Sequence, residues 1–239
     1  MDKTIDQLIR DEFLPLVREV FGERLVSVIL YGSGADGSYR SGVSDVNILI
    51  LLDEPQPALL ERLAREGRRK MKKHRITPMV ISEAEYRQGS DVFPLEYLDI
   101  RDRHITLYGS DFTDELEFNE LHLRHQLEEQ LRGSLFSLRQ LILSARGRRR
   151  LLSRELPRWY GGLQALFKGL HRLVAPGEVP KWGEDALPIL AKEFSFDPEP
   201  FRRLIALRRG ERVEVVPLSR QLLLELAALV REVDRWESG

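Results

Sequence analysis

The chain has 239 residues, of which 42% are hydrophobic and 31% charged, a balance typical of globular proteins with one large or two smaller domains. Its 37 basic and 38 acidic residues leave a net charge of -1, so no global field attracts nucleic acid, and a nucleic-acid partner is not expected. The absence of cysteine excludes disulfide bonds, thiolate metal sites and cysteine nucleophiles.

The first residues of the chain mix both charges before any apolar stretch, which is unlike a signal peptide. No apolar run approaches the ~20 residues that a helix needs to cross a bilayer. We therefore expect a cytoplasmic protein that has no membrane partner.

The first half of the chain alternates helical and strand-like patterns. Apolar residues recur at steps of three and four over residues 4–21, which predicts an amphipathic helix. Runs rich in β-branched residues predict strands over 25–31, 46–52, 75–81 and 105–108, with helices over 55–73 and 92–103. The second strand is apolar almost throughout, which indicates that both of its faces are covered, whereas Pro78 weakens the pattern of the third.

The second half of the chain has only helical patterns. Helices are predicted over residues 114–145, 150–174, 183–194, 198–208 and 217–236, with proline or glycine at the breaks. The predicted fold class is therefore an α/β (α+β) head with a mixed sheet over residues 1–112, followed by an all-α helical bundle over residues 113–239. We place the boundary between Gly109 and Thr113.

A glycine-rich turn between the first two predicted strands is the most informative segment of the head. Gly32, Gly34 and Gly37 satisfy the G-x-G-x-x-G spacing of a dinucleotide-binding turn. That motif needs a crossover helix within a unit of ~30 residues, and the short segment 38–44 cannot supply one. A Walker phosphate loop is excluded as well, because no Gly-Lys-Ser/Thr follows the strand.

A second pattern in the same segment is a strand followed by Gly32-Ser33 and, after a turn, by Asp45-Val46-Asn47 at the start of the next strand. It resembles the nucleotidyltransferase superfamily of DNA polymerase beta, especially its small bacterial members and the kanamycin and aminoglycoside nucleotidyltransferases. The resemblance implies a nucleotidyltransferase head, a helical tail that helps to hold the acceptor, and Mg²⁺-dependent use of a nucleoside triphosphate.

The chemistry of the resemblance assigns roles to five residues. Gly32 allows the backbone to approach a phosphate, and the hydroxyl of Ser33 can bond its oxygens, with Ser44 as a third nucleotide-binding residue. Residues two apart on a strand point to the same face, so Asp45 and Asn47 are the candidate catalytic and metal-binding pair. Mg²⁺ is the expected ion, because it takes hard oxygen ligands and bridges triphosphates.

Three departures from the family pattern bear on activity. Asn47 stands where the family has a second carboxylate, and Asp36 stands where many relatives carry arginine. The third carboxylate belongs on a later strand, but residues 76–81 contain no acid. The acids that follow this strand match no expected position; they are Glu83, Glu85, Glu96 and Asp99.

With one of three expected carboxylates placed, we expect a protein that binds a Mg²⁺–nucleoside triphosphate and whose nucleotidyl transfer is impaired or lost. Two alternatives stay open. The protein is an active transferase that modifies a small-molecule hydroxyl, aminoglycoside-like, or a protein hydroxyl, or it is an interaction protein that uses its helical tail. A homodimer also stays open as an assembly.

Two other clusters have both a functional and a structural interpretation. Residues 67–75 contain six lysines and arginines and one histidine, which could face a polyanion or form a solvated helix end. His122, His125 and Glu129 lie on one helical face, where they could hold a metal or form a polar face of the bundle. We expect the structural interpretation of both.

Overall fold

The computed structural model describes residues 4–35, 37, 39, 45–115, 118–178, 181 and 183–236. The chain forms two compact units, Met1–Phe118 and Asn119–Gly239. In the described residues, no helix is long and apolar enough to cross a membrane.

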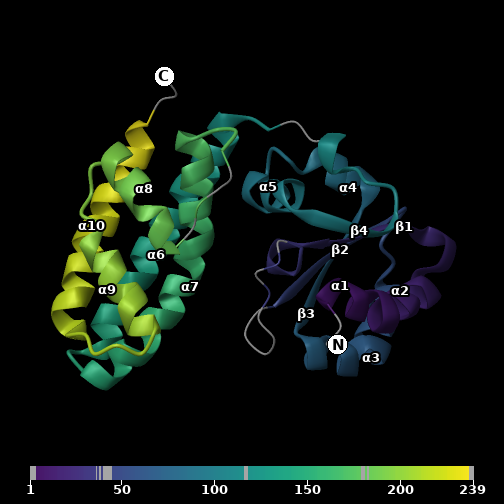
Figure 1. The fold of residues 1–239 in the computed structure, drawn as a ribbon, viewed down its shortest axis with the longest axis horizontal. Helices are drawn as coiled ribbons and strands as arrows, with labels where there is room; N and C mark the ends of the chain where they lie inside the picture. The colour runs from purple at the N-terminus through teal and green to yellow at the C-terminus, as the bar shows by residue number, and fades with distance from the viewer. Residues whose placement is uncertain are drawn as a thin grey trace. The chain divides into compact units, whose positions relative to one another are not determined.

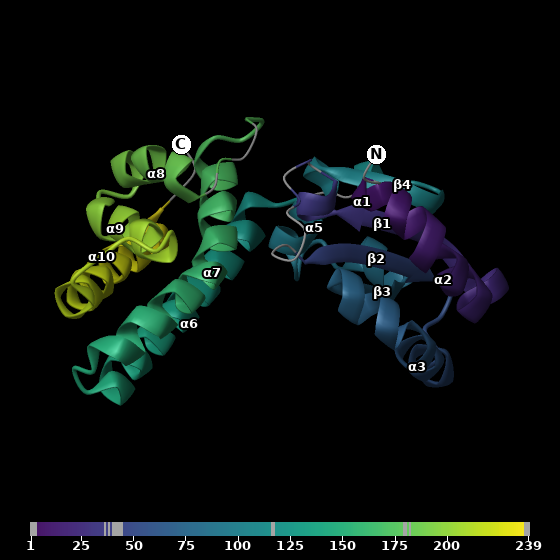
Figure 2. The same ribbon diagram turned by 60° about the horizontal axis from the view of Figure 1, so that its bottom comes forward.

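The first unit contains a four-stranded mixed sheet, as the sequence predicted. Its strands are β1 (Leu25–Tyr31), β2 (Val46–Leu52), β3 (Ile76–Ser82) and β4 (His104–Gly109). They lie in the order β3-β2-β1-β4 (Figure 2). β1 is antiparallel to both β2 and β4, and β2 is parallel to β3. Pro78 is tolerated because β3 is an edge strand, where a missing N–H leaves no neighbour unpaired.

Helices cover both faces of this sheet (Figure 1). One face packs against a continuous helical segment, made of α1 (Ile5–Leu8), a π-helical turn (Ile9–Phe13) and α2 (Leu14–Phe21), and against α3 (Pro57–His74). The other face packs against α4 (Glu83–Gln88) and α5 (Pro94–Asp102). The sequence predicted α5 but missed the short helix α4.

The burial pattern of β2 explains why this strand is apolar throughout. Its even-numbered side chains, such as Ile48 and Ile50, join the core under α1–α3, while Leu49 and Leu51 join the core under α4 and α5. All four side chains are fully buried, and burial of each stabilises the fold by roughly 1.5–3 kcal/mol. The two-sided core therefore fixes which residues of β2 face each layer.

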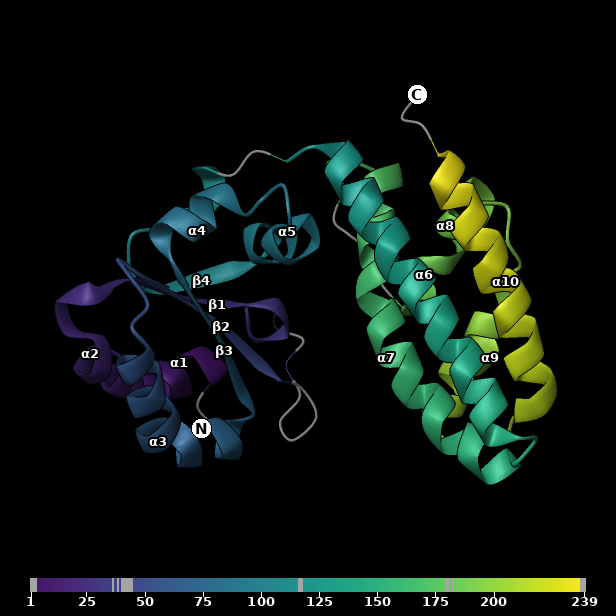
Figure 3. The same cartoon turned by 180° about the vertical axis from the view of Figure 1, so that it is seen from behind.

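The second unit is a bundle of α-helices (Figure 3). Its helices are α6 (Glu120–Ala145), α7 (Arg149–Val174), α8 (Leu187–Glu193), α9 (Glu199–Arg208) and α10 (Val215–Arg235). α6 starts six residues after the predicted 114, because residues 113–115 form a 3-10 turn. A chain of edge-to-face rings, Tyr160–Phe167–Phe201–Phe196, joins α7 to α9 and the segment before it.

Candidate functional site

One end of the sheet carries a row of four polar or aromatic side chains, one from each strand. The register pairs Thr77 with Asn47, Asn47 with Tyr31, and Tyr31 with His104. Paired residues on adjacent strands point to the same face, so the four side chains form one line across the sheet. We call this line the polar row.

The glycine turn that follows β1 lies directly against the polar row. Residues Gly32–Gly34 form a single 3-10 turn, closed by a hydrogen bond from Ala35 N to Gly32 O of 2.9 Å. Gly32 has a φ of +68°, and a Cβ there would lie 3.1 Å from Asn47 Nδ2. Both facts require glycine at this position, because a side chain would be strained and would crowd Asn47. The backbone of the turn and the side chain of Asn47 are therefore close enough to contact the same ligand.

The strands around this turn exclude the dinucleotide interpretation, as the spacing predicted. β1 and β2 pair antiparallel, whereas a dinucleotide-binding unit joins two parallel strands through a helix. Gly34 has a packing role, since a Cβ there would lie 2.9 Å from Leu30 Cδ1.

Asp45, immediately before β2, is held by an arginine from the end of α3. Arg75 Nε donates to Asp45 Oδ1 at 2.8 Å. The backbone of Arg75 is fixed as well: its φ is 54°, in the left-handed region, and its carbonyl accepts a hydrogen bond from Val46 N at 2.9 Å. The side chains of Asp45 and Arg75 are 56% and 47% exposed, so solvent screens the pair. The carboxylate that the sequence assigned to a metal is thus bound to a guanidinium.

Burial raises the pKa of Tyr31, in the middle of the polar row, to about 12, with smaller contributions in the same direction from the negative charges of Asp99 and Glu96 on α5. Tyr31 is therefore protonated at neutral pH, and its hydroxyl is available as a hydrogen-bond donor next to Asn47.

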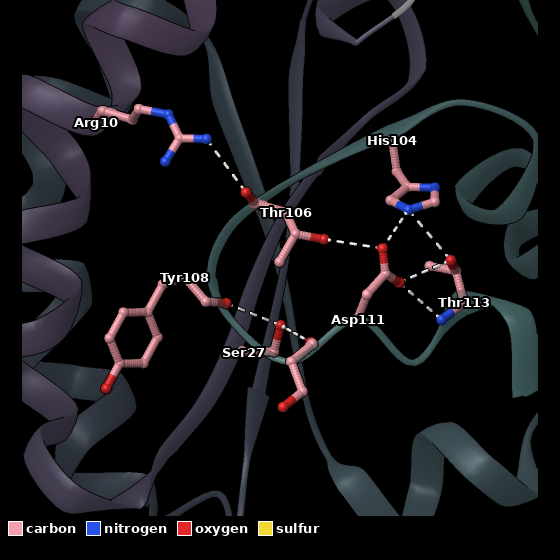
Figure 4. A network of polar contacts seen from close by, with 8 residues as sticks. Arg10, Ser27, His104, Thr106, Tyr108, Asp111 and Thr113 are labelled. Atoms are coloured by element: carbon pink, nitrogen blue, oxygen red, sulfur yellow. Dashed lines mark hydrogen bonds and ion pairs between the residues drawn. The ribbon is translucent and has the colours of Figure 1, made fainter.

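The fourth member of the polar row, His104, belongs to a hydrogen-bonded network that fixes the segment after β4 (Figure 4). His104 Nε2 lies 2.7 Å from Asp111 Oδ2, and Thr106 Oγ1 donates to the same oxygen at 3.1 Å. Thr113 donates to Asp111 Oδ1 from its backbone N–H at 3.0 Å and from its hydroxyl at 2.7 Å. Burial raises the pKa of Asp111, but these hydrogen bonds outweigh it and lower the pKa to about 2.

The acids that follow β3 lie at the opposite end of the sheet, because Ser82, the last residue of β3, pairs with Leu52. Glu85 accepts hydrogen bonds from Ser82 N at 2.7 Å and Ser82 Oγ at 2.8 Å, which caps helix α4. Glu83 pairs with Arg87 on the same helix at 2.9 Å. Neither is the missing third carboxylate; the β3 residue that the register places beside Asn47 is Thr77.

The donor set at this end of the sheet does not fit a resident Mg²⁺ ion. Among the described residues of the strands and of the segment before β2, it consists of one carboxylate that is already paired with Arg75, the amide of Asn47 and the hydroxyl of Thr77, while Asp99 and Glu96 of α5 act on Tyr31. Among the described residues, no three acidic, histidine or cysteine side chains converge on a common point. A magnesium site is normally held by carboxylates that supply net negative charge, and here the guanidinium cancels the one that is present.

The other predicted residues are distributed as follows. Ser33 is half-buried in the glycine turn, while Ser44 and Asp36 lie outside the described residues. In the basic run, Lys73 and His74 pair with Glu12, at 3.3 and 3.0 Å. His125 and Glu129 are exposed on α6, which agrees with the expected polar face.

Sequence reasoning missed Arg75 and Thr77 as residues of this site. Arg75 was included in the basic run and at the start of the predicted strand 75–81, and Thr77 only in that strand, which contains no acid. The helical pattern between two strands could have signalled that β2 and β3 are parallel neighbours. It could not have given their register, which decides what stands beside Asp45 and Asn47.

The comparisons with known proteins support the family resemblance. No protein-family model matches the chain. A Methanocaldococcus jannaschii protein, provisionally assigned as a protein adenylyltransferase, is 30% identical over 95 residues, which cover 40% of this chain and 56% of that protein. The chain thus spans a little over half the length of this relative.

A solved structure resembles both units of the chain. The crystal structure of spectinomycin adenyltransferase AAD(9) from Enterococcus faecialis, with ATP and spectinomycin, aligns with a TM-score of 0.61 and 16% identity, over 97% of this chain and 100% of that chain. At this identity the likeness concerns the fold alone. The chain has the fold of AAD(9), a mixed-sheet unit followed by a helical bundle, and this likeness agrees with the resemblance to the nucleotidyltransferase superfamily.

Proposed function

We propose that this protein binds a nucleoside triphosphate at the end of the sheet that carries the polar row, and that its nucleotidyl transfer is impaired or lost. Gly32, Ser33 and Ser44 are the proposed nucleotide-binding residues, with Asp45 and Asn47 as the proposed counterparts of the catalytic pair. In this proposal Mg²⁺ enters as the counter-ion of the nucleotide, because the donor set that the described residues offer does not fit a resident ion.

The observation that carries the proposal is the composition of the polar row. Nucleotidyl transfer depends on positioning the phosphates and on neutralising charge at the reacting phosphorus, for which converging carboxylates hold two metal ions. Here the positions beside each other on β2 and β3 are Asn47 and Thr77, which are neutral. The glycine turn, by contrast, keeps a phosphate-compatible backbone, with a positive φ at Gly32 and the hydroxyl of Ser33 within the turn. Binding is thus retained and catalysis reduced.

A second candidate function is active transfer to a small-molecule hydroxyl. It is favoured by the alignment over both units with AAD(9), a protein whose crystal contained ATP and spectinomycin. In this candidate the missing acid comes from α5, where Asp99 and Glu96 act on Tyr31.

Binding and transfer are tested in one series of experiments. ATP, GTP, CTP and UTP are titrated by calorimetry, with Mg²⁺, into the wild type and the Ser33→Ala variant. Transfer is followed with α-phosphate-labelled nucleotides and a panel of acceptors that includes spectinomycin and protein hydroxyls. We expect micromolar binding of at least one nucleotide, weakened about threefold to tenfold by Ser33→Ala because one hydrogen bond is lost, and no labelled product.

The outcomes separate the candidates. Rapid labelling of an acceptor that is lost in Asp99→Asn or Glu96→Gln would establish the active transferase and contradict impaired transfer. Absence of binding by all four nucleotides would contradict both candidates and leave a role in protein interaction.

A further inference from the structure

We infer that Arg75 takes the place of a divalent metal at Asp45, so that the site binds the phosphates of a nucleotide without a metal ion. The inference rests on the proposed function, since it concerns the same nucleotide site. Its subject is the Asp45–Arg75 pair, which we call the site pair, with Asp45 as a positioning residue and Arg75 as the residue that binds phosphate.

The guanidinium of Arg75 lies directly against the Asp45 carboxylate. Arg75 Nε lies 2.8 Å from Asp45 Oδ1, so a cationic group already occupies one oxygen of this carboxylate. This contact uses Nε, and an arginine carries further N–H donors on its two terminal nitrogens. A planar guanidinium suits phosphate oxygens, which it can bind in pairs. The site pair can therefore stay intact while Arg75 donates to a phosphate.

The charge of the site differs from that of a site with three carboxylates. A group of three carboxylates repels a triphosphate. Metal ions must neutralise the charges of the carboxylates and of the triphosphate before the triphosphate can bind beside them. Here Asn47 and Thr77 are neutral, and the charges of Asp45 and Arg75 cancel. The described residues beside Asp45 on β2 and β3 therefore add no carboxylate that a metal ion would have to neutralise.

Arg75 is held in place before any ligand binds. Its left-handed backbone ends α3, and its carbonyl accepts from Val46 N at 2.9 Å, next to Asp45 in the chain. The two following residues, Ile76 and Thr77, pair with Val46 and Asn47. A side chain anchored at its backbone and at Nε loses little conformational freedom on binding, which favours affinity.

The surroundings of Arg75 add to the attraction for an anion. The last turns of α3 also carry Arg68, Arg69, Lys70 and Lys72, for which the described part of the chain provides no ion pair. These cations, of which Lys70 is half-buried and the other three are exposed, raise the local positive potential in a chain whose net charge is -1.

The first unit contains a matched control pair. Arg24 Nη1 lies 3.2 Å from Asp53 Oδ2, with side chains 38% and 54% exposed, close to the 47% and 56% of the site pair. Asp45 precedes the first residue of β2 and Asp53 follows the last. The two pairs thus have the same residue types and similar exposure at opposite ends of one strand.

The experiment titrates ATP calorimetrically into the full chain, once in excess EDTA and once in Mg²⁺. The variants are Arg75→Gln and Asp45→Asn, with Arg24→Gln and Asp53→Asn as matched controls, and each is checked for folding by circular dichroism. We expect the wild type to bind ATP in EDTA within about threefold of its affinity in Mg²⁺. Arg75→Gln weakens binding in EDTA about tenfold or more, because a charge-assisted contact is lost. Asp45→Asn keeps or strengthens that binding, because the amide oxygen can still accept from Arg75 Nε while the negative charge beside the phosphates is removed, and the controls leave it unchanged.

Three results overturn the inference, and they differ in what they say about the proposed function. ATP binding that requires Mg²⁺ and is lost in Asp45→Asn would make Asp45 a metal ligand and leave the proposed function standing. Binding in EDTA that Arg75→Gln does not change would place the phosphates elsewhere in the site. Absence of ATP binding in both buffers would remove the proposed function itself. If Arg75→Gln does not fold, Asp45→Asn still decides, because the two hypotheses predict opposite effects for it.

Discussion

The two ends of the sheet in the first unit carry the same interaction in different settings. An aspartate–arginine pair lies at each end of β2, Asp45 with Arg75 at 2.8 Å and Asp53 with Arg24 at 3.2 Å. The glycine turn and the polar row lie near Asp45. Near Asp53, a side chain of the sheet donates hydrogen bonds to backbone carbonyls at and after the end of β4. An exposed pair contributes little to stability at either end, so its surroundings decide whether it has a further role.

The Asp53 end shows how a sheet end is closed by internal contacts. Ser27, fully buried, donates its hydroxyl towards Tyr108 O at 3.0 Å and Ser110 O at 2.8 Å. Gly109 has a φ of +76°, and a Cβ there would lie 2.0 Å from Val26 O. Ser27 and these two carbonyls satisfy one another, whereas Asn47 of the polar row lies against the glycine turn, which can accept a ligand.

The largest expected effect is on stability, at the closed end. Gly109→Ala combines a positive φ with a clash against backbone, so we expect it to lower the free energy of unfolding of the first unit by about 3 kcal/mol. Native-state hydrogen exchange would report this for the first unit separately from the bundle. Gly22→Ala is the control: φ is +55° but a Cβ would meet nothing within 4 Å, so it should cost about 1 kcal/mol. Equal losses of unfolding free energy in Gly109→Ala and Gly22→Ala would show that the structure around residue 109 relaxes and relieves the clash.

The second prediction restores the missing acids at the ligand end. The double variant Asn47→Asp/Thr77→Glu places two carboxylates side by side, next to Asp45. We expect ATP affinity in Mg²⁺ to rise about tenfold and affinity in EDTA to fall, because the new charges repel phosphate. Calorimetry measures both, with Thr77→Gln as the control for added bulk. An unchanged Mg²⁺ dependence would show that residues 47 and 77 do not face the phosphates.

The third prediction concerns pH and the network that fixes the segment after β4. The pKa of Asp111 is about 2 in the folded chain, below its ordinary value of 3.8. The stabilisation of the folded state by the ionised Asp111 carboxylate is therefore complete above about pH 4 and is lost as the pH falls through 2. The carboxylate is 45% exposed, so Asp111→Asn should cost about 1 kcal/mol at neutral pH and remove this part of the acid dependence. Chemical unfolding of the wild type and of Asp111→Asn at pH 7 and pH 2.5 checks this prediction. An equal loss of unfolding free energy between the two pH values in both proteins would exclude Asp111 as the source.

The smallest expected effect is that of the control pair. Asp53→Asn should change the unfolding free energy by no more than about 0.5 kcal/mol, as expected for an exposed pair, and should leave nucleotide binding unaltered. Thermal unfolding measures the first quantity. A loss above 1 kcal/mol would show that Asp53 has a structural role and cannot serve as the control for Asp45.

The local patterns of the sequence were sufficient for most of the fold. β1 and β2 have the predicted bounds, and the helices of the second unit follow the predicted breaks at proline and glycine. Each of these depends on residues that are neighbours in the chain. Helix α4 was missed because its short capping box, Ser82 to Glu85, is too brief to show a helical period.

The sequence by itself determined that Gly32, Ser33, Asp45 and Asn47 surround a turn between two strands, and that acids are missing from the family pattern. Only the tertiary structure decided that Thr77 stands beside Asn47, that Arg75 binds Asp45, and that Glu85 caps a helix at the other end. The physical reason is that strand register depends on how both faces of β2 are buried by distant helices. A register is a property of packing between segments, and no window of the sequence contains it.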